Sequence, residues 1–197
     1  MSRVLGVDLS SFALDLVALD EDTNRAEWRR VVLPPARKKS PTPAWERLLA
    51  LPSLMPHHSW YEDIFLVAIE APYGSNQGGT QASLNRTVGA VAASLPSDLR
   101  VPERCWIVRP DEWKRHCGIG AKAKPTWDDL ARLTPAGTWL VQEADVASTS
   151  AFHGGTHLPE DDRWQNARDA FCLAHYARET NALAVERCQL AKPLTLL

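Results

Sequence analysis

The sequence lacks a cysteine framework, a membrane-length apolar run and an excess of one charge. Its cysteines show no CxxC spacing and do not pair with the six histidines in a zinc-finger pattern. We therefore expect reduced thiols in a cytoplasmic protein. No stretch approaches the roughly 18 apolar residues that a membrane span needs. The opening, MSRVLGVDLSS, has no apolar signal-peptide core, so we expect neither a secretory signal nor a membrane partner.

The charge balance also excludes little. The chain has 22 basic and 24 acidic residues, a net charge of −2. A carboxylate-rich site would offset basic patches in this sum, so the distribution of charge matters more than the total. The length of 197 residues and the 45% apolar content are typical of one globular domain. We find no repeat or boundary and expect a single domain over 1–197.

The hydrophobic pattern predicts an α/β fold with a mixed sheet flanked by helices. Its first three strands are joined by connections too short for crossover helices, which indicates an antiparallel meander followed by parallel strands. The predicted strands are Arg3–Leu9, Phe12–Leu19, Ala26–Leu33, Ile64–Ile69 and Cys105–Val108. The predicted helices are Ala44–Leu54, Thr80–Leu95, Pro110–Cys117, Thr126–Leu133 and Glu160–Leu183. We further expect a proline-rich connection over 34–43, a mobile loop over 143–160 and a tail over 189–197.

Three acidic residues lie at or beside apolar segments that we expect to be buried. Asp8 ends an apolar strand, Glu70 follows the apolar run IFLVAI, and Asp169 lies beside the apolar stripe of the last helix. A single acid of this kind is more often a turn cap or a salt-bridge partner. Carboxylates at the edge of a core are costly unless something neutralises them. Three from separate elements therefore indicate convergence on a metal ion.

The last helix offers further oxygen ligands. Asp162, Asn166 and Asp169 are spaced by four and three residues, so they share one helix face. Oxygen ligands without nitrogen or sulfur favour Mg²⁺, with Mn²⁺ as a substitute. Two such ions can activate a water and stabilise the leaving oxygen in phosphodiester hydrolysis. Asp162 can equally serve as helix N-terminal charge, so the fourth ligand stays open between it and Asn166.

A local basic cluster is a candidate phosphate-binding surface. A solvated face is the alternative interpretation, whereas phosphate contacts would make binding sensitive to salt. The cluster comprises Arg109, Lys114, Arg115, Lys122 and Lys124.

The chain resembles the RuvC family of Holliday-junction resolvases, in particular its divergent or phage-type members. The resemblance is carried by VLGVDLSS, FLVAIEAPYG, IVRPDEWKRHCGIGAKAK and NARDAFCLAHYA, in this order. It implies an RNase H-like fold and Mg²⁺-dependent cleavage of branched DNA by a homodimer. It also implies a role in DNA recombination or repair, in a bacterial cytoplasm or that of a phage-infected host.

The resemblance assigns roles to individual residues. Asp8, Glu70 and Asp169 take the metal-binding positions, and Lys124 or Lys114 lies near the scissile phosphate, with Lys122 as the alternative to Lys124. The chain departs from the family at Asn166, where a second helix acid is common.

Two other functions stay open from the sequence. Asn166 would also suit a non-catalytic module that binds branched DNA. A sugar-kinase or ATPase-like protein is a further alternative, because it opens on a similar strand. That class needs a second phosphate-binding loop, which this sequence lacks.

Overall fold

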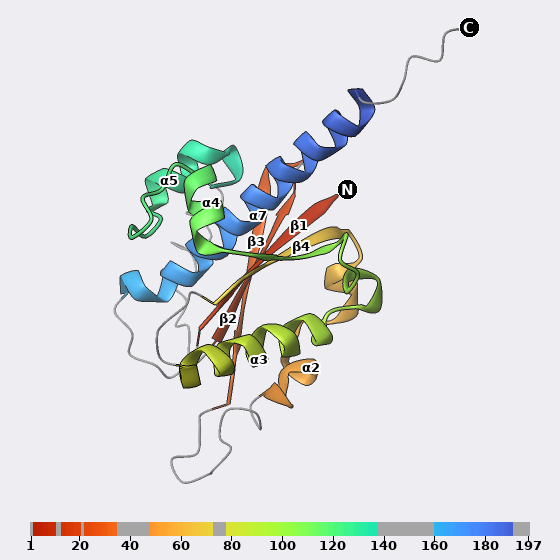
Figure 1. Ribbon diagram of the computed structural model, residues 1–197, viewed down its shortest axis with the longest axis vertical. Helices are drawn as coiled ribbons and strands as arrows, with labels where there is room; N and C mark the ends of the chain where they lie inside the picture. The colour runs from red at the N-terminus through yellow and green to blue at the C-terminus, as the bar shows by residue number, and fades with distance from the viewer. Residues whose placement is uncertain are drawn as a thin grey trace, which may run out of the picture.

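A five-stranded mixed sheet forms the centre of the fold (Figure 1). The computed structural model describes residues 2–10, 13–20, 22–34, 48–72, 78–137 and 160–190, without the side chains of 78–84, 160–163 and 186–190. The strand order is β3-β2-β1-β4-β5, antiparallel from β3 to β1 and parallel from β1 to β5. The strands are β1 Arg3–Leu9, β2 Ala13–Asp20, β3 Arg25–Val32, β4 Ile64–Glu70 and β5 Cys105–Val108. The predicted combination of a meander and parallel strands is confirmed.

Helices cover both faces of the sheet. Helix α7 runs across one face with α4 and α5 beside it, whereas α2 and α3 cover the other (Figure 1). The helices are α2 Leu51–Leu54, α3 Gly78–Ser94, α4 Pro110–His116, α5 Trp127–Leu133 and α7 Glu160–Leu190. Two 3₁₀ turns that the sequence did not predict, η1 and η2, span His58–Tyr61 and Ser97–Leu99.

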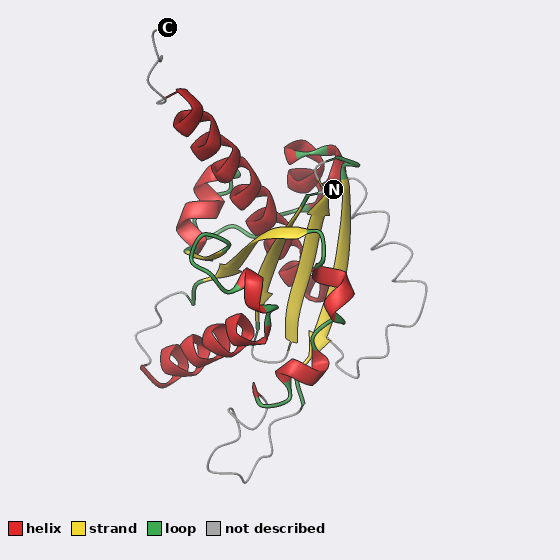
Figure 2. Cartoon of the chain, turned by 90° about the vertical axis from the view of Figure 1, so that its right-hand side faces the viewer, coloured by secondary structure: helices red, strands yellow, loops and turns green. Residues whose placement is uncertain are grey.

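The observed boundaries correct several predictions, most of them by one or two residues. β3 begins and ends one residue earlier than predicted, and α3 begins at Gly78 rather than Thr80. The final helix continues seven residues past its predicted end at Leu183, to Leu190, so the first two residues of the predicted tail are helical. This last part of α7 extends beyond the sheet (Figure 2) and exposes Val185. Intrahelical hydrogen bonds therefore continue where an apolar stripe no longer marks the helix.

Several predictions fall outside the described part of the chain. They concern residues 35–43 of the proline-rich connection, residues 44–47 of the helix predicted over Ala44–Leu54, residues 143–159 and residues 191–197. The prediction of one continuous helix over Ala44–Leu54 is wrong, because residues 49–50 form a turn before α2. Within the described part, no helix combines the length and apolar character needed to cross a membrane.

Strand alternation divides the core into two layers. In β1, Val4 packs in the layer beneath α7, whereas Leu5 and Val7 pack in the layer beneath α2 and α3. Successive side chains of a strand point to opposite faces, so Gly6 and Asp8 face α7. At Gly6 a β-carbon would overlap the carbonyl oxygen of Ala170, which shows how closely α7 approaches β1. This close contact places α7 directly over the end of the strand that carries Asp8.

Candidate active site

Asp8 and Glu70 meet where two neighbouring parallel strands end. Both lie on the α7 face of the sheet, because Glu70 is in phase with Leu66 and Ala68 of that layer. Asp8 is only 4% exposed, and its carboxyl donates a hydrogen bond to Glu70. Burial first, and then this bond and the charge of Glu70, raise the pKa of Asp8 well above its usual range. The indole of buried Trp113 in α4 donates a further hydrogen bond of 3.2 Å to Glu70 Oε1.

Asp169 adds a third carboxylate from α7. The charge of Asp169 raises the pKa of Asp8, and the charge of Glu70 raises the pKa of Asp169. The three acids therefore interact electrostatically as one group. Burial is the main cause that brings the pKa of Asp169 to about 6. A hydrogen bond of 3.0 Å from Gln165 Nε2 and the charge of Lys114 act in the opposite direction. The structure thus brings together the three acids that the sequence singled out.

Burial and the neighbouring carboxylates disfavour the charged forms of Asp8 and Asp169. Among the described residues, no three His, Cys, Asp or Glu side chains are arranged to hold one metal ion as they stand. Asp8 and Glu70 instead share a hydrogen bond between their carboxyls. The donor set contains only oxygen, which is the chemistry of a magnesium or manganese ligand set. A divalent cation could replace the shared proton once the side chains rotate.

The two candidates for a fourth ligand have different outcomes. The side chain of Asp162 lies outside the described part of the chain. Asn166 is described, and its amide donates a hydrogen bond to Asp15 of β2. Asp15 stands directly opposite Asp8 in the β1–β2 register and is completely buried. Sequence reasoning missed Asp15, although an acid inside the apolar strand ALDLVALD was a signal that could have found it.

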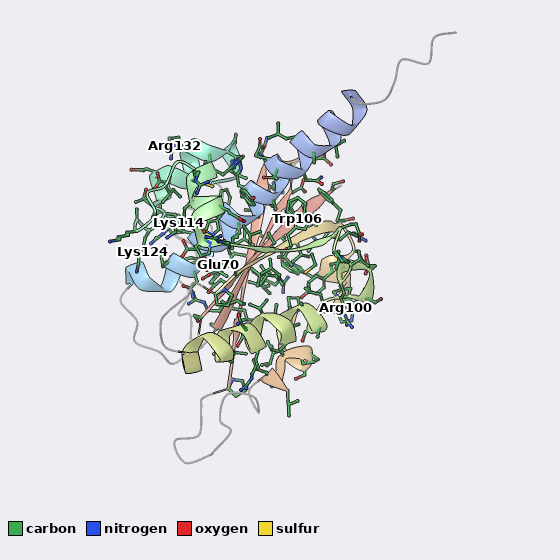
Figure 3. All side chains as sticks on the ribbon, in the orientation of Figure 1. Glu70, Arg100, Trp106, Lys114, Lys124 and Arg132 are labelled. Atoms are coloured by element: carbon green, nitrogen blue, oxygen red, sulfur yellow. The ribbon has the colours of Figure 1, made fainter. Side chains whose placement is uncertain are left out.

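The basic residues do not form one uniform surface. Lys114 lines a cavity of about 290 Å³ together with Glu70. Figure 3 labels both residues. The ammonium of Lys114 donates a hydrogen bond of 3.0 Å to the carbonyl of Ala123. Lys124 is exposed on the loop that follows α4, as is Lys122.

The two arginines of the basic cluster already have an acidic partner. Arg109 forms an ion pair of 3.0 Å with Asp111, and Arg115 approaches the same carboxylate at 3.8 Å. The arginine side chain of each ion pair is exposed to solvent, so each pair contributes little to the stability of the fold. Phosphates could replace Asp111 as the partner of both side chains.

We expect Asp169→Asn to stabilise the metal-free protein at neutral pH. The native carboxyl keeps its proton up to about pH 6, whereas an unfolded aspartate loses it near 3.8. The native state therefore loses stability as pH rises from 4 to 6, and the amide removes this loss. The gain should be up to about 3 kcal/mol at pH 7 and vanish below pH 4. Urea unfolding in EDTA at both pH values measures it.

A matched control for this experiment is Asp98→Asn, which changes the same charge at an exposed site in η2. It should leave the free energy of unfolding close to that of the wild type, because an exposed ion pair contributes little. If Asp169→Asn were less stable than the wild type at pH 7, the acid would be held by favourable contacts and the electrostatic description would be wrong.

The sheet order, the long helix across it and the meander define an RNase H-like fold. Among solved structures with this fold are two of RuvC from Thermus thermophilus, one of them in complex with a Holliday junction substrate. The complex is 13% identical, covers 93% of this chain and 96% of its own, and has a TM-score of 0.57. The other is 15% identical, with coverages of 92% and 96% and a TM-score of 0.52.

The structure of the yeast mitochondrial Holliday junction resolvase Ydc2 is also similar to this chain. It is 14% identical, covers 96% of this chain and 84% of its own, and has a TM-score of 0.51. No protein-family model matches the sequence, and neither does any curated protein. The likeness to these resolvases is therefore a likeness of fold over nearly the whole chain.

Proposed function

We propose that this protein is a divalent-metal-dependent endonuclease that cleaves branched DNA, with four-way junctions as its main substrate. The observation that carries the proposal is the meeting of Asp8, Glu70 and Asp169 at the ends of β1 and β4 beneath α7. Solved structures that share the fold belong to Holliday junction resolvases. The fold supports the substrate class, and the three acids support the chemistry.

The three acids suit Mg²⁺, with Mn²⁺ as a substitute. Asp8, Glu70 and Asp169 would hold the metal, with a further oxygen from Asn166 or Asp162. Their mutual repulsion, which raises the pKa of Asp8 and Asp169, is the electrostatic cost that a cation would remove. When bound, the metal would lower the pKa of a coordinated water and offset charge on the phosphate.

The surrounding side chains orient the acids and bind the DNA. Trp113 holds Glu70, and Gln165 holds Asp169, by the hydrogen bonds described above. Lys114 lines the cavity next to Glu70, where its ammonium would stabilise the charge that develops on the scissile phosphate. Lys124 would bind a neighbouring phosphate.

Three further basic residues, Arg109, Arg115 and Lys122, would contact the DNA backbone away from the cleaved bond. Phosphate contacts give no sequence preference and weaken as salt rises. A homodimer would place two sites for paired cuts on a four-way junction, which itself has two-fold symmetry. Such an enzyme would act on recombination or repair intermediates in the cytoplasm of a bacterium or a phage-infected host.

The test is cleavage of a labelled four-way junction, compared with a flap, a linear duplex and an RNA–DNA hybrid. We expect cleavage in Mg²⁺ or Mn²⁺, none in EDTA, and the highest rate on the four-way junction. Cleavage of the hybrid alone would contradict the substrate class. Tight junction binding without cleavage in either metal would instead favour a non-catalytic binding module, which the Asn166–Asp15 contact also suits.

A further inference from the structure

Asp15 is the most completely enclosed acid next to the candidate active site. It is 0% exposed, and three side chains donate hydrogen bonds to its carboxylate. Arg30 of β3 binds both oxygens, through Nε at 3.0 Å and through its terminal nitrogen at 3.1 Å. The indole of Trp28 adds a bond of 2.8 Å, and Asn166 of α7 adds another. The hydrogen bonds from these donors offset the cost of burying the carboxylate.

The register explains why this network lies beside the three acids. Asp15 pairs with Asp8 across β1 and β2, and Arg30 pairs with Asp15 across β2 and β3. Paired residues point to the same face, so all three lie beneath α7. Asn166 and Asp169, one helical turn apart on α7, then face Asp15 and the three-acid group respectively. Asn166 therefore brings the network to within one helical turn of Asp169 on α7.

The chemistry of an amide decides what Asn166 does at this position. A carboxylate with an arginine partner only accepts hydrogen bonds, so Asn166 must use its NH₂ group toward Asp15. The carbonyl oxygen sits on the other branch of the same planar group. Asp15 thus selects one of the two orientations of the amide and turns the oxygen, which is the only atom of the amide able to bind Mg²⁺, away from itself.

We propose that Asp15 is a positioning residue that orients Asn166 so that its carbonyl oxygen completes the ligand set of Asp8, Glu70 and Asp169. Asp15 also supplies, behind the amide, the negative charge that an acid at position 166 would have carried. Arg30 keeps that charge tolerable in the interior. The inference rests on the proposed function, because it deepens the same metal site.

The experiment measures Mn²⁺ affinity of the full chain without DNA, by electron paramagnetic resonance of the free ion. Residues that orient a metal ligand typically contribute 10- to 100-fold to affinity. We therefore expect Asn166→Ala and Asp15→Asn each to weaken binding about 10-fold or more. An amide at position 15 can both donate and accept, so it no longer selects one orientation of Asn166. Asp98→Asn removes an equal charge at a distance and should leave the affinity unchanged.

The exchange variant Asp15→Asn/Asn166→Asp separates positioning from a general structural role. It keeps the charge and the hydrogen bond but reverses the donor, and it places a carboxylate oxygen at the metal. We expect its Mn²⁺ affinity to return to within about three-fold of the wild type. A network that merely supported the fold would not be rescued in this way, because Arg30 is still left without its carboxylate partner.

Folding of the variants is checked by circular dichroism. If Asp15→Asn does not fold, Asp15→Asn/Arg30→Gln replaces it, because removing both charges leaves no buried charge unpaired. Wild-type affinity in folded Asn166→Ala, or in a folded variant that carries Asp15→Asn alone or with Arg30→Gln, would overturn the proposal. Failure of the proposed function looks different: the wild type itself would bind no Mn²⁺, or Asp8→Asn would bind it unchanged.

Discussion

Asp8→Asn is expected to abolish cleavage of four-way junctions while leaving their binding intact. Asp8 is the most buried of the three acids and is the one that the other two approach. The amide removes the negative charge that would hold the metal, and with it transition-state stabilisation of several kcal/mol. The cleavage rate should fall on the order of 10³-fold or more. Single-turnover cleavage and a gel-shift assay at the same salt concentration measure the two effects.

The same variant separates catalysis from stability. Because burial and like charge raise the pKa of Asp8, its ionised form costs the native state free energy. Asp8→Asn should therefore unfold at higher urea than the wild type in EDTA at pH 7, although it is inactive. Asp98→Asn is the control and should change neither property. Wild-type cleavage by Asp8→Asn would refute the proposed metal site and the mechanism built on it.

Gly6→Ala is expected to destabilise the protein severely. A β-carbon at this position would overlap the carbonyl oxygen of Ala170, and it would also crowd the backbone nitrogen of Ala174. Backbone atoms of a long packed helix cannot move aside cheaply, so α7 would have to lift from β1. We expect a loss of about 3 kcal/mol in the free energy of unfolding, measured with urea. Cleavage should fall as well, because α7 carries Asp169.

Gly89→Ala in α3 is the matched control for this substitution. Nothing lies within 4 Å of a β-carbon added there, and alanine favours a helix more than glycine does. That variant should be neutral or gain about 0.5–1 kcal/mol. Equal unfolding midpoints for Gly6→Ala and the wild type would mean that α7 is not tightly packed on β1.

The expected effects of Asp8→Asn and Gly6→Ala both follow from the way α7 packs on the sheet. The acids come from β1, β4 and α7, and the close packing of α7 on β1 holds them at one place. Burying neighbouring carboxylates at this place destabilises the native state. Functional sites commonly oppose stability in this way, and local rules of folding are broken most often where the chemistry resides.

Several site residues could be predicted because their signal is local. Asp8 and Glu70 each interrupt or end an apolar strand, and the carboxyl ends of parallel strands lie at one edge of a sheet. Asp169 follows from the spacing of the last helix. The strand positions follow in the same way, since alternation and apolar runs depend only on near neighbours in the sequence.

The acid inside the strand ALDLVALD is a local signal, but it does not reveal which residues Asp15 contacts. Its burial depends on the β2–β3 register, which brings Arg30 opposite it across a separation of 15 residues. Its contact with Asn166 depends on where α7 crosses β2. By contrast, Asp111 lies two residues from Arg109 and four from Arg115, so both ion pairs are local contacts that helix spacing could have predicted.

The sequence by itself determined the mixed sheet, its helices and the three acids, because periodicity and strand ends are properties of short segments. Only the tertiary structure decided how these acids interact. It showed that Asp8 and Glu70 share a hydrogen bond, and that Asn166 turns to Asp15. Such contacts join residues distant in sequence, so strand register and the packing of α7 on the sheet set them, and no local pattern records either.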